Sequence, residues 1–227
     1  VDDREFLFVA DANRQQIVVF NEKGNYVHAF GEPENFRPTD IVIHEDQVLV
    51  ANVKNHAIHV YDRRSYEPIR TIPSLEPGED GFLAQPTHLC VAGQTVFVND
   101  FGSFKIKNYD MEGHYLGSIG TYGEKPGQLV RPKGIAVDHQ HNLYVVDAAF
   151  ENTQIFNRNG IILMFFGGPY SSHGDMYLPA DVAIDYSNTE FFEPYVNERF
   201  KLEYLIWVTN QYGPDKVNVY GFIKNAD

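Results

Sequence analysis

Three side chains with metal-ligating chemistry occur at one recurring offset in this sequence. Asp40, His88 and Asp181 each stand two residues after a proline, and the fourth such position holds Gly134. Carboxylates and imidazoles are ligands that proteins offer to Ca²⁺ or Zn²⁺, so the three would form a cation site if the fold brings them together. The alternative is structural, because an Asp in a turn also accepts backbone N–H groups.

The prolines that precede these positions are almost evenly spaced. Successive spacings are 48, 46 and 47 residues along Pro38, Pro86, Pro132 and Pro179. A second landmark is an apolar run that ends in Asp or Asn, as in LFVAD, VLVAN, VFVND, LYVVD and LIWVTN. A third follows nine or ten residues later, as IVVF, IHVY, IKNY, TQIF and VNVY. The chain is therefore a tandem repeat.

Each repeat is predicted to contain four short strands. In the best-defined copy they cover residues 134–138, 142–148, 153–157 and 161–166, and Asp, Asn or Gly separates the runs of β-branched and aromatic residues. Four-stranded sheets that repeat every ~40–50 residues are typical of a β-propeller, an all-β fold. Five blades are recognisable, and the first lacks its inner strand while the last lacks its outer one. We therefore expect residues 1–227 to form a single, N-terminally incomplete propeller domain, with six blades in the complete protein.

The repeat resembles a known family. RPKGIAVD, NLYVVD and QIF in one blade resemble the NHL repeat of six-bladed propellers. More narrowly, GQLVRPKGIAVD, LYVVDAAFENTQIFN and LIWVTNQYGPDKVNVYGF resemble bacterial exported NHL propellers that are often encoded beside multihaem c-type cytochromes. This resemblance implies a periplasmic or extracellular location, a multihaem cytochrome as protein partner, and a scaffold without catalysis. Propeller lyases and lactone hydrolases imply an alternative, a metal-dependent enzyme with Asp40, His88 and Asp181 around the central channel.

Charge and cysteine content remove several classes of function. Eighteen Lys and Arg stand against thirty-one Asp and Glu, and the formal charge of −13 opposes nucleic-acid binding. The single cysteine, Cys90, excludes both an intrachain disulfide and a CxxCH haem attachment, so no cofactor is bound covalently. No apolar run reaches ~18 residues, which predicts no membrane span. The chain shows no signal peptide, and Val1-Asp2-Asp3 is an unusual natural start that is compatible with a removed leader.

One insertion interrupts the repeat. Residues 186–204 add about sixteen residues between the first two strands of the last blade, and six of these nineteen residues are aromatic. Phe191, Phe192, Tyr195 and Phe200 need apolar cover, either from their own blade or from another protein. We predict that these four side chains bind a protein partner, with an insertion folded onto its own blade as the alternative.

Residues just before the prolines are predicted to fill the space between blades. Phe36, Leu83, Leu129 and Tyr177 lie in the Gly- and Pro-rich segments that connect one blade to the next. Segments that join packed sheets bury apolar side chains between them. The sequence thus favours an acidic, non-enzymatic scaffold for protein–protein contacts.

Overall fold

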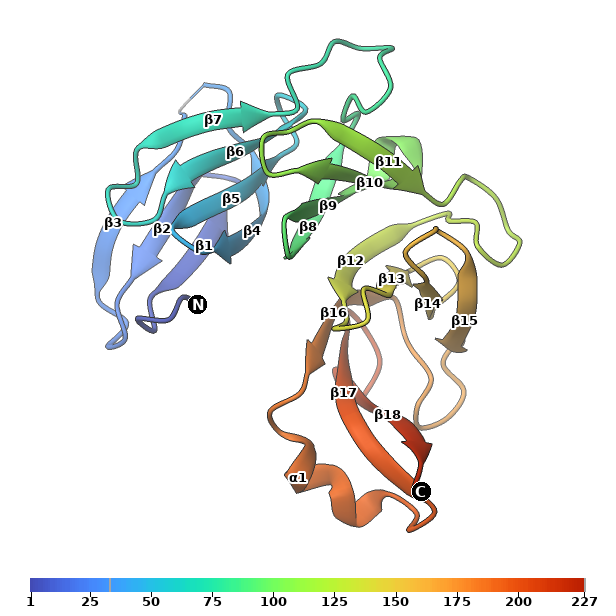
Figure 1. Ribbon diagram of the computed structural model, residues 1–227. Coiled ribbons are helices and arrows are strands. Elements are labelled where there is room, and N and C mark those ends of the chain that lie inside the picture. Colours follow the sequence, from blue (N-terminus) through green and yellow to red (C-terminus); the bar gives the residue numbers. More distant parts are fainter. Residues whose placement is uncertain (33, 227) are drawn as a thin grey trace. The chain divides into compact units, whose positions relative to one another are not determined.

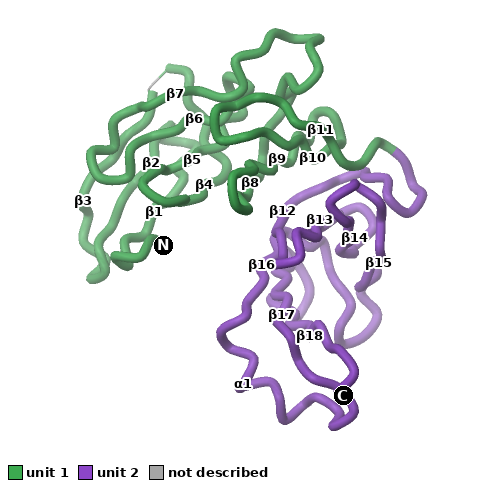
Figure 2. The backbone as a smooth tube through the Cα atoms, viewed as in Figure 1, with its two compact units in different colours: residues 1–122 green, residues 123–227 purple. Residues whose placement is uncertain are grey.

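The computed structural model describes residues 1–32 and 34–226, and strands dominate it (Figure 1). The chain divides into two compact units, unit 1 (Val1–Tyr122) and unit 2 (Gly123–Asp227), coloured separately in Figure 2. Every sheet is antiparallel and contains strands that are consecutive in the sequence. Unit 1 therefore holds the first three blades and unit 2 the last two.

Unit 1 begins with a three-stranded sheet, and two four-stranded sheets follow. Blade 1 contains β1 (Leu7–Asp11), β2 (Gln16–Phe20) and β3 (Tyr26–Phe30). Blade 2 contains β4 (Pro38–His44), β5 (Gln47–Asn52), β6 (Ala57–Asp62) and β7 (Pro68–Ile72). Blade 3 contains β8 (Pro86–Ala92), β9 (Thr95–Asp100), the short 3₁₀ helix η1 (Phe101–Ser103), β10 (Lys105–Asp110) and β11 (Tyr115–Ile119).

Unit 2 contains one four-stranded and one three-stranded sheet. Blade 4 contains β12 (Pro132–Val137), β13 (Leu143–Asp147), β14 (Asn152–Phe156) and β15 (Ile162–Gly167). Blade 5 contains β16 (Pro179–Asp185), the short helices α1 (Thr189–Phe192) and η2 (Glu193–Tyr195), β17 (Phe200–Asn210) and β18 (Val217–Asn225). The four strands predicted for blade 4 are confirmed to within two residues at each end.

Within each unit, neighbouring sheets bury their facing surfaces against each other. The alternation along β5 shows this, because Val48 and Val50 belong to the core with blade 1, whereas Leu49 and Ala51 belong to the core with blade 3. In unit 2 a further cluster joins β13 and β14 of blade 4 to β17 of blade 5. A strand buried on both faces is apolar at every position, which explains the continuous apolar runs in the repeat.

Polar side chains at the ends of the second strands hold the connections between blades. Asn52 Oδ1 accepts a hydrogen bond from the Arg37 N–H at 2.8 Å, and Asp100 Oδ1 accepts one from the Gln85 N–H at 2.6 Å. Asp147 and Asn210 do the same for the N–H groups of Val130 and Tyr177, at 2.8 and 3.0 Å. All four acceptor residues are buried, so each satisfies a loop N–H that would otherwise lack a partner.

Three of the four residues predicted to fill the space between blades do so. Phe36, Leu83 and Leu129 are fully buried, whereas Tyr177 is 44% exposed and its neighbour Met176 is fully buried. The prediction for Tyr177 is therefore wrong by one residue. Met176 stands three residues before its proline, as Leu83 and Leu129 do, and its thioether packs closely against Gly167.

A non-glycine residue in the left-handed region immediately precedes β2, β6, β10 and β14, the strands that follow an Asp- or Asn-ended strand in the first four blades. Gln15, His56, Phe104 and Glu151 have φ of 58°, 60°, 57° and 54°. This conformation is unfavourable for residues with a Cβ, so it persists where contacts hold it. His56 Nδ1 lies 2.8 Å from the Ala84 carbonyl oxygen, the Phe104 ring lies 4.8 Å from the Tyr122 ring, and Glu151 accepts the Leu178 N–H at 2.9 Å. These three residues therefore fasten the next connecting segment.

The close approach of β12 and β16 allows no side chain at Gly134. A Cβ built there would lie 2.0 Å from Asp181 Oδ1 and 2.5 Å from the Asp181 Cα. We predict that Gly134→Ala lowers the free energy of unfolding by about 2 kcal/mol or more, since the packed backbone must move. Gly168→Ala is the matched control, because a Cβ at Gly168 meets nothing within 4 Å. Equal denaturant midpoints for the two variants would contradict this packing.

Candidate protein-interaction site

The insertion between β16 and β17 is a compact turn of chain. The Asp185 carboxylate accepts hydrogen bonds from the Ser187 N–H at 2.7 Å and from Asn188 Nδ2 at 2.6 Å, which fixes the start of the insertion. The short helices α1 and η2 follow, and α1 lies beside β17 (Figure 1). Phe200 already belongs to β17 and pairs with Asn225 of β18. The last five residues of the predicted insertion thus extend the blade 5 sheet.

The four aromatic residues predicted to bind a partner have different environments. The Phe192 ring packs edge-on against Trp207 of β17, with 5.8 Å between ring centroids, and is half-buried. Phe191 and Tyr195 are 74% and 82% exposed, and Phe200 is 38% exposed. Phe192 thus attaches the insertion to its own blade, while Phe191 and Tyr195 face solvent. The alternative interpretation therefore holds for Phe192, whereas partner binding by Phe191, Tyr195 and Phe200 stays a prediction.

Buried tyrosines hold the two ends of the insertion. The hydroxyl oxygens of Tyr144 and Tyr204 lie 2.6 Å apart, and the Tyr204 hydroxyl donates to Asp138 at 3.3 Å. The Tyr186 ring stacks on His139 with 3.7 Å between centroids, and its hydroxyl accepts the His139 N–H at 2.9 Å. Burial raises the pKa of Tyr144 to about 12 and that of Tyr204 further, so both stay protonated. The insertion that bears the exposed side chains of Phe191 and Tyr195 is therefore held in place at both ends.

Acidic side chains surround the exposed aromatic pair. Glu190, Glu193 and Glu198 are all exposed and lie within eight residues of Phe191, and Arg199 is the one cation between residues 186 and 200. Aromatic rings attract cations through their faces, and neighbouring carboxylates add to this attraction. We call Phe191, Tyr195, Glu190 and Glu193 the insertion patch. The patch is suited to a surface rich in Lys or Arg.

The three predicted metal ligands are engaged in different ways. In unit 1, the Asp40 carboxylate accepts the Ile41 N–H at 2.8 Å and, across to blade 3, the Leu89 N–H at 2.9 Å. His88 Nδ1 lies 3.3 Å from Thr87 Oγ1. In unit 2, Asp181 accepts the Val182 N–H at 2.9 Å, and loss of hydration beside the inner strands raises the pKa of its carboxyl. Asp40 and Asp181 thus accept backbone N–H groups, but from strand positions and not from a turn.

Residues 1–32 and 34–226 contain no group of three or more His, Cys, Asp or Glu side chains arranged to hold a metal ion. Asp40 and His88 belong to unit 1 and Asp181 to unit 2. The channel metal site stays a prediction. In the same part of the chain, no helix is long and apolar enough to cross a membrane.

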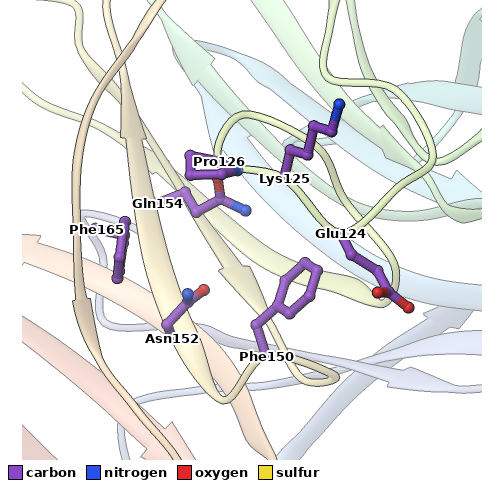
Figure 3. Close-up of a pocket in the computed structure, with 7 residues that line it drawn as sticks. All are labelled: Glu124, Lys125, Pro126, Phe150, Asn152, Gln154 and Phe165. Carbon is purple, nitrogen blue, oxygen red and sulfur yellow. The ribbon is translucent and has the colours of Figure 1, made fainter.

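A small hollow in unit 2 offers little room for a ligand. It measures about 100 Å³ and lies among Glu124, Lys125, Pro126, Phe150, Asn152, Gln154 and Phe165 (Figure 3). Pockets for organic ligands usually measure ~300–1,000 Å³. The Gln154 amide is already used, since its oxygen accepts the Gly127 N–H at 2.8 Å and its nitrogen donates to the Gln128 carbonyl at 2.9 Å. We assign no site there.

His59 forms a buried polar cluster that the sequence pattern does not reveal. Its Nδ1 lies 3.2 Å from Glu32 Oε1, and its Nε2 lies 3.0 Å from Asn55 Oδ1 and 3.1 Å from Asn52 Nδ2. Burial lowers the pKa of His59, although the nearby Glu32 carboxylate opposes this. In the sequence, the only hint of a polar cluster at His59 is the neighbouring histidine, His56. The structure shows that His56 is not part of the cluster, because its ring contacts the Ala84 carbonyl.

Acid should destabilise unit 1 through His59. Because its folded pKa is lowered, the unfolded chain takes up the proton first, so stability falls as the pH drops from about 7.5 to about 5.5. We predict that His59→Gln makes the free energy of unfolding less sensitive to pH over this range, as measured by denaturant titration. His141→Asn, at an exposed turn residue with φ of 62°, is the control and should keep the original pH dependence.

Comparisons with known proteins agree with this architecture. Residues 1–74 match a family model described as DUF5128: 6-bladed beta-propeller. Residues of this chain are 25% identical over 152 residues to Protein brain tumor of Drosophila melanogaster, and the match covers 65% of this chain and 14% of that protein. The chain thus spans about one seventh of the length of that relative.

Solved structures with similar folds include a lyase and a chain of the nidogen/laminin complex. A catalytically inactive virginiamycin B lyase from Staphylococcus aureus, crystallised with quinupristin, is 12% identical, with a TM-score of 0.66 over 99% of this chain and 67% of that chain. A chain of the nidogen/laminin complex is 18% identical, with a TM-score of 0.62 over 90% of this chain and 69% of that chain. Sheets, repeats and comparisons together define the fold as a β-propeller. At these identities the likeness concerns the fold alone.

Proposed function

We propose that this propeller is a non-enzymatic module for protein–protein contacts and that the insertion patch is its main contact. The observation that carries the proposal is the exposure of Phe191 and Tyr195 on a segment whose neighbour, Phe192, packs against Trp207. Large aromatic side chains supply much of the binding energy at protein interfaces. Because the patch is held in place before binding, little conformational entropy is lost when a partner covers it.

The proposed partner presents lysine or arginine. Glu190 and Glu193 flank the exposed rings, and the whole chain has a formal charge of −13. Complementary charge accelerates association and makes it sensitive to salt. Resemblance to exported NHL propellers encoded beside multihaem cytochromes supports a multihaem c-type cytochrome as this partner and a periplasmic or extracellular location. A haem absorption band in the complex purified from the native source would test the choice of partner.

Removing the exposed rings should weaken the complex without unfolding the propeller. We predict that Phe191→Ala with Tyr195→Ala weakens partner binding at least about tenfold and leaves the melting temperature unchanged, because neither ring is buried. Phe192→Ala should lower the free energy of unfolding by about 1–2 kcal/mol, because it removes the contact with Trp207. Pull-down with the co-purified partner and thermal denaturation measure the two effects.

The control for the aromatic pair is another exposed ring in unit 2. Tyr212 is 57% exposed and lies outside the insertion, so Tyr212→Ala should bind the partner normally. Glu190→Gln with Glu193→Gln should reduce the dependence of association on salt. Undiminished binding by the Phe191 and Tyr195 double variant would refute the proposed contact.

The metal-dependent lyase is the second candidate, and the lyases among the structural neighbours support it at the level of fold. It requires a bound metal that involves Asp40, His88 and Asp181. Elemental analysis of protein purified without chelator distinguishes the two proposals. If the protein is a scaffold, we expect less than one equivalent of Ca²⁺ or Zn²⁺ per chain. One bound equivalent of metal that is lost in the Asp181→Asn variant would favour the enzyme.

A further inference from the structure

A hollow of about 460 Å³ opens on unit 1. It lies at the β1–β2 turn, the residue before β4 and the β5–β6 turn, and its lining residues are Ala12, Asn13, Gln15, Arg37, Val53 and Lys54. The volume falls within the ~300–1,000 Å³ of pockets that bind small organic molecules. Both charged lining residues, Arg37 and Lys54, are cations, although the chain as a whole is strongly acidic.

One buried side chain positions both cationic residues. Asn52 Oδ1 accepts the Arg37 N–H at 2.8 Å and the Lys54 N–H at 3.1 Å, and its Nδ2 donates to the Asn35 carbonyl at 2.8 Å. Asn52 is fully buried, so the two backbone positions are fixed relative to each other. The Lys54 ammonium group also donates to the Glu34 carbonyl oxygen. The backbone positions of these two exposed cationic residues on one rim of the hollow are therefore fixed.

Arg37 differs from the other arginines of unit 1. Arg4, Arg14, Arg63 and Arg64 each form an ion pair with an aspartate, and Arg70 donates to Gln47 and to the Met111 carbonyl. Among the residues that the structure describes, no carboxylate lies within 4.0 Å of the charged groups of Arg37 or Lys54. The nearby Asp11 carboxylate is paired with Arg14 at 3.3 Å. An unneutralised pair of cations in an acidic chain is a favourable place for an anion.

We propose that this hollow binds a small organic anion that carries a phosphate monoester. An arginine guanidinium binds two phosphate oxygens at once, and a lysine ammonium contributes a point charge. Two cations match the charge of about −1.5 to −2 on a phosphate monoester near pH 7. The side-chain amides of Asn13 and Gln15 supply hydrogen-bonding groups for the remainder of the ligand. The proposal does not depend on the insertion patch, which lies in unit 2.

Glycerol phosphate titrated into the whole chain, followed by calorimetry or by amide NMR shifts, tests the proposal. We expect saturable binding that Arg37→Gln and Lys54→Gln each weaken about tenfold, since each removes a charge-assisted contact. Arg37→Lys should give an intermediate loss, because it keeps the charge but removes the two-pronged donor. Arg64→Gln removes the same charge at a side chain that is 74% exposed and should bind normally.

The proposal is overturned if binding is not saturable, or if Arg64→Gln weakens binding as much as the site variants do. Equal affinity for acetate would also overturn it, because it would show only general attraction to anions. Inorganic phosphate is the second ligand to be titrated. It should bind no more tightly than glycerol phosphate if the hollow accepts an organic group. Tighter binding of inorganic phosphate would exclude the organic ligand. Unchanged melting temperatures for all four variants ensure that any loss of binding arises at the site.

Discussion

The burial of each sheet against its neighbours is the constraint on which the rest of the structure depends. β5 has no solvent-facing side, because Val50 packs toward blade 1 and Leu49 toward blade 3. Burial of apolar surface contributes roughly 25 cal/mol per Å², so such strands supply most of the stabilisation within each unit. The sheet faces between neighbouring blades are then unavailable for function. Turns, connecting segments, insertions and the strand positions that stay exposed, such as Leu163 and Phe165 of β15, are left to provide binding surfaces.

Polar side chains at the strand ends hold the connecting segments that form those surfaces in place. Asn52 and Asp147 each accept N–H groups from a connecting segment, and the left-handed residues His56 and Glu151 contact the next segment. Gln15 has the same backbone conformation but lines the hollow with Arg37. The same backbone conformation therefore holds a connecting segment in three blades and borders the proposed anion site in the first.

The sequence predicts what depends on repetition. Strand positions in blade 4 follow from recurring prolines, apolar runs and turn residues, and the buried positions of Phe36, Leu83 and Leu129 follow from the spacing of connecting segments. The prediction for Tyr177 was wrong because Tyr177 and Met176 are both large and apolar enough to fill the space between blades. Which of the two neighbours enters that space depends on the close approach of Met176 to Gly167. Arg37 and Lys54 lie seventeen residues apart, and only the pairing of β4 with β5 brings them together.

The insertion shows a different limit of sequence analysis. Its aromatic content indicates that something must cover the rings, but the identity of the covered ring depends on the geometry of β17. Phe192 meets Trp207, whereas its neighbour Phe191 projects into solvent. Adjacent residues on a short helix point in directions about 100° apart, so one step along the chain separates the ring that packs against Trp207 from the ring that faces solvent.

The hydrogen bonds of Asp40 indicate why function is expected at the loops and not at the inner strands. One carboxylate oxygen accepts the N–H of Ile41 and the other accepts the N–H of Leu89 in the next blade. Loss of this carboxylate would leave both donors without their partner, and a buried N–H left without a partner costs about 1–3 kcal/mol. Asp40 therefore contributes to the contact between β4 and β8. Phe191 and Tyr195 each contact the Phe192 ring, at centroid distances of 5.2 and 6.5 Å, but most of their surface stays exposed and available to a partner.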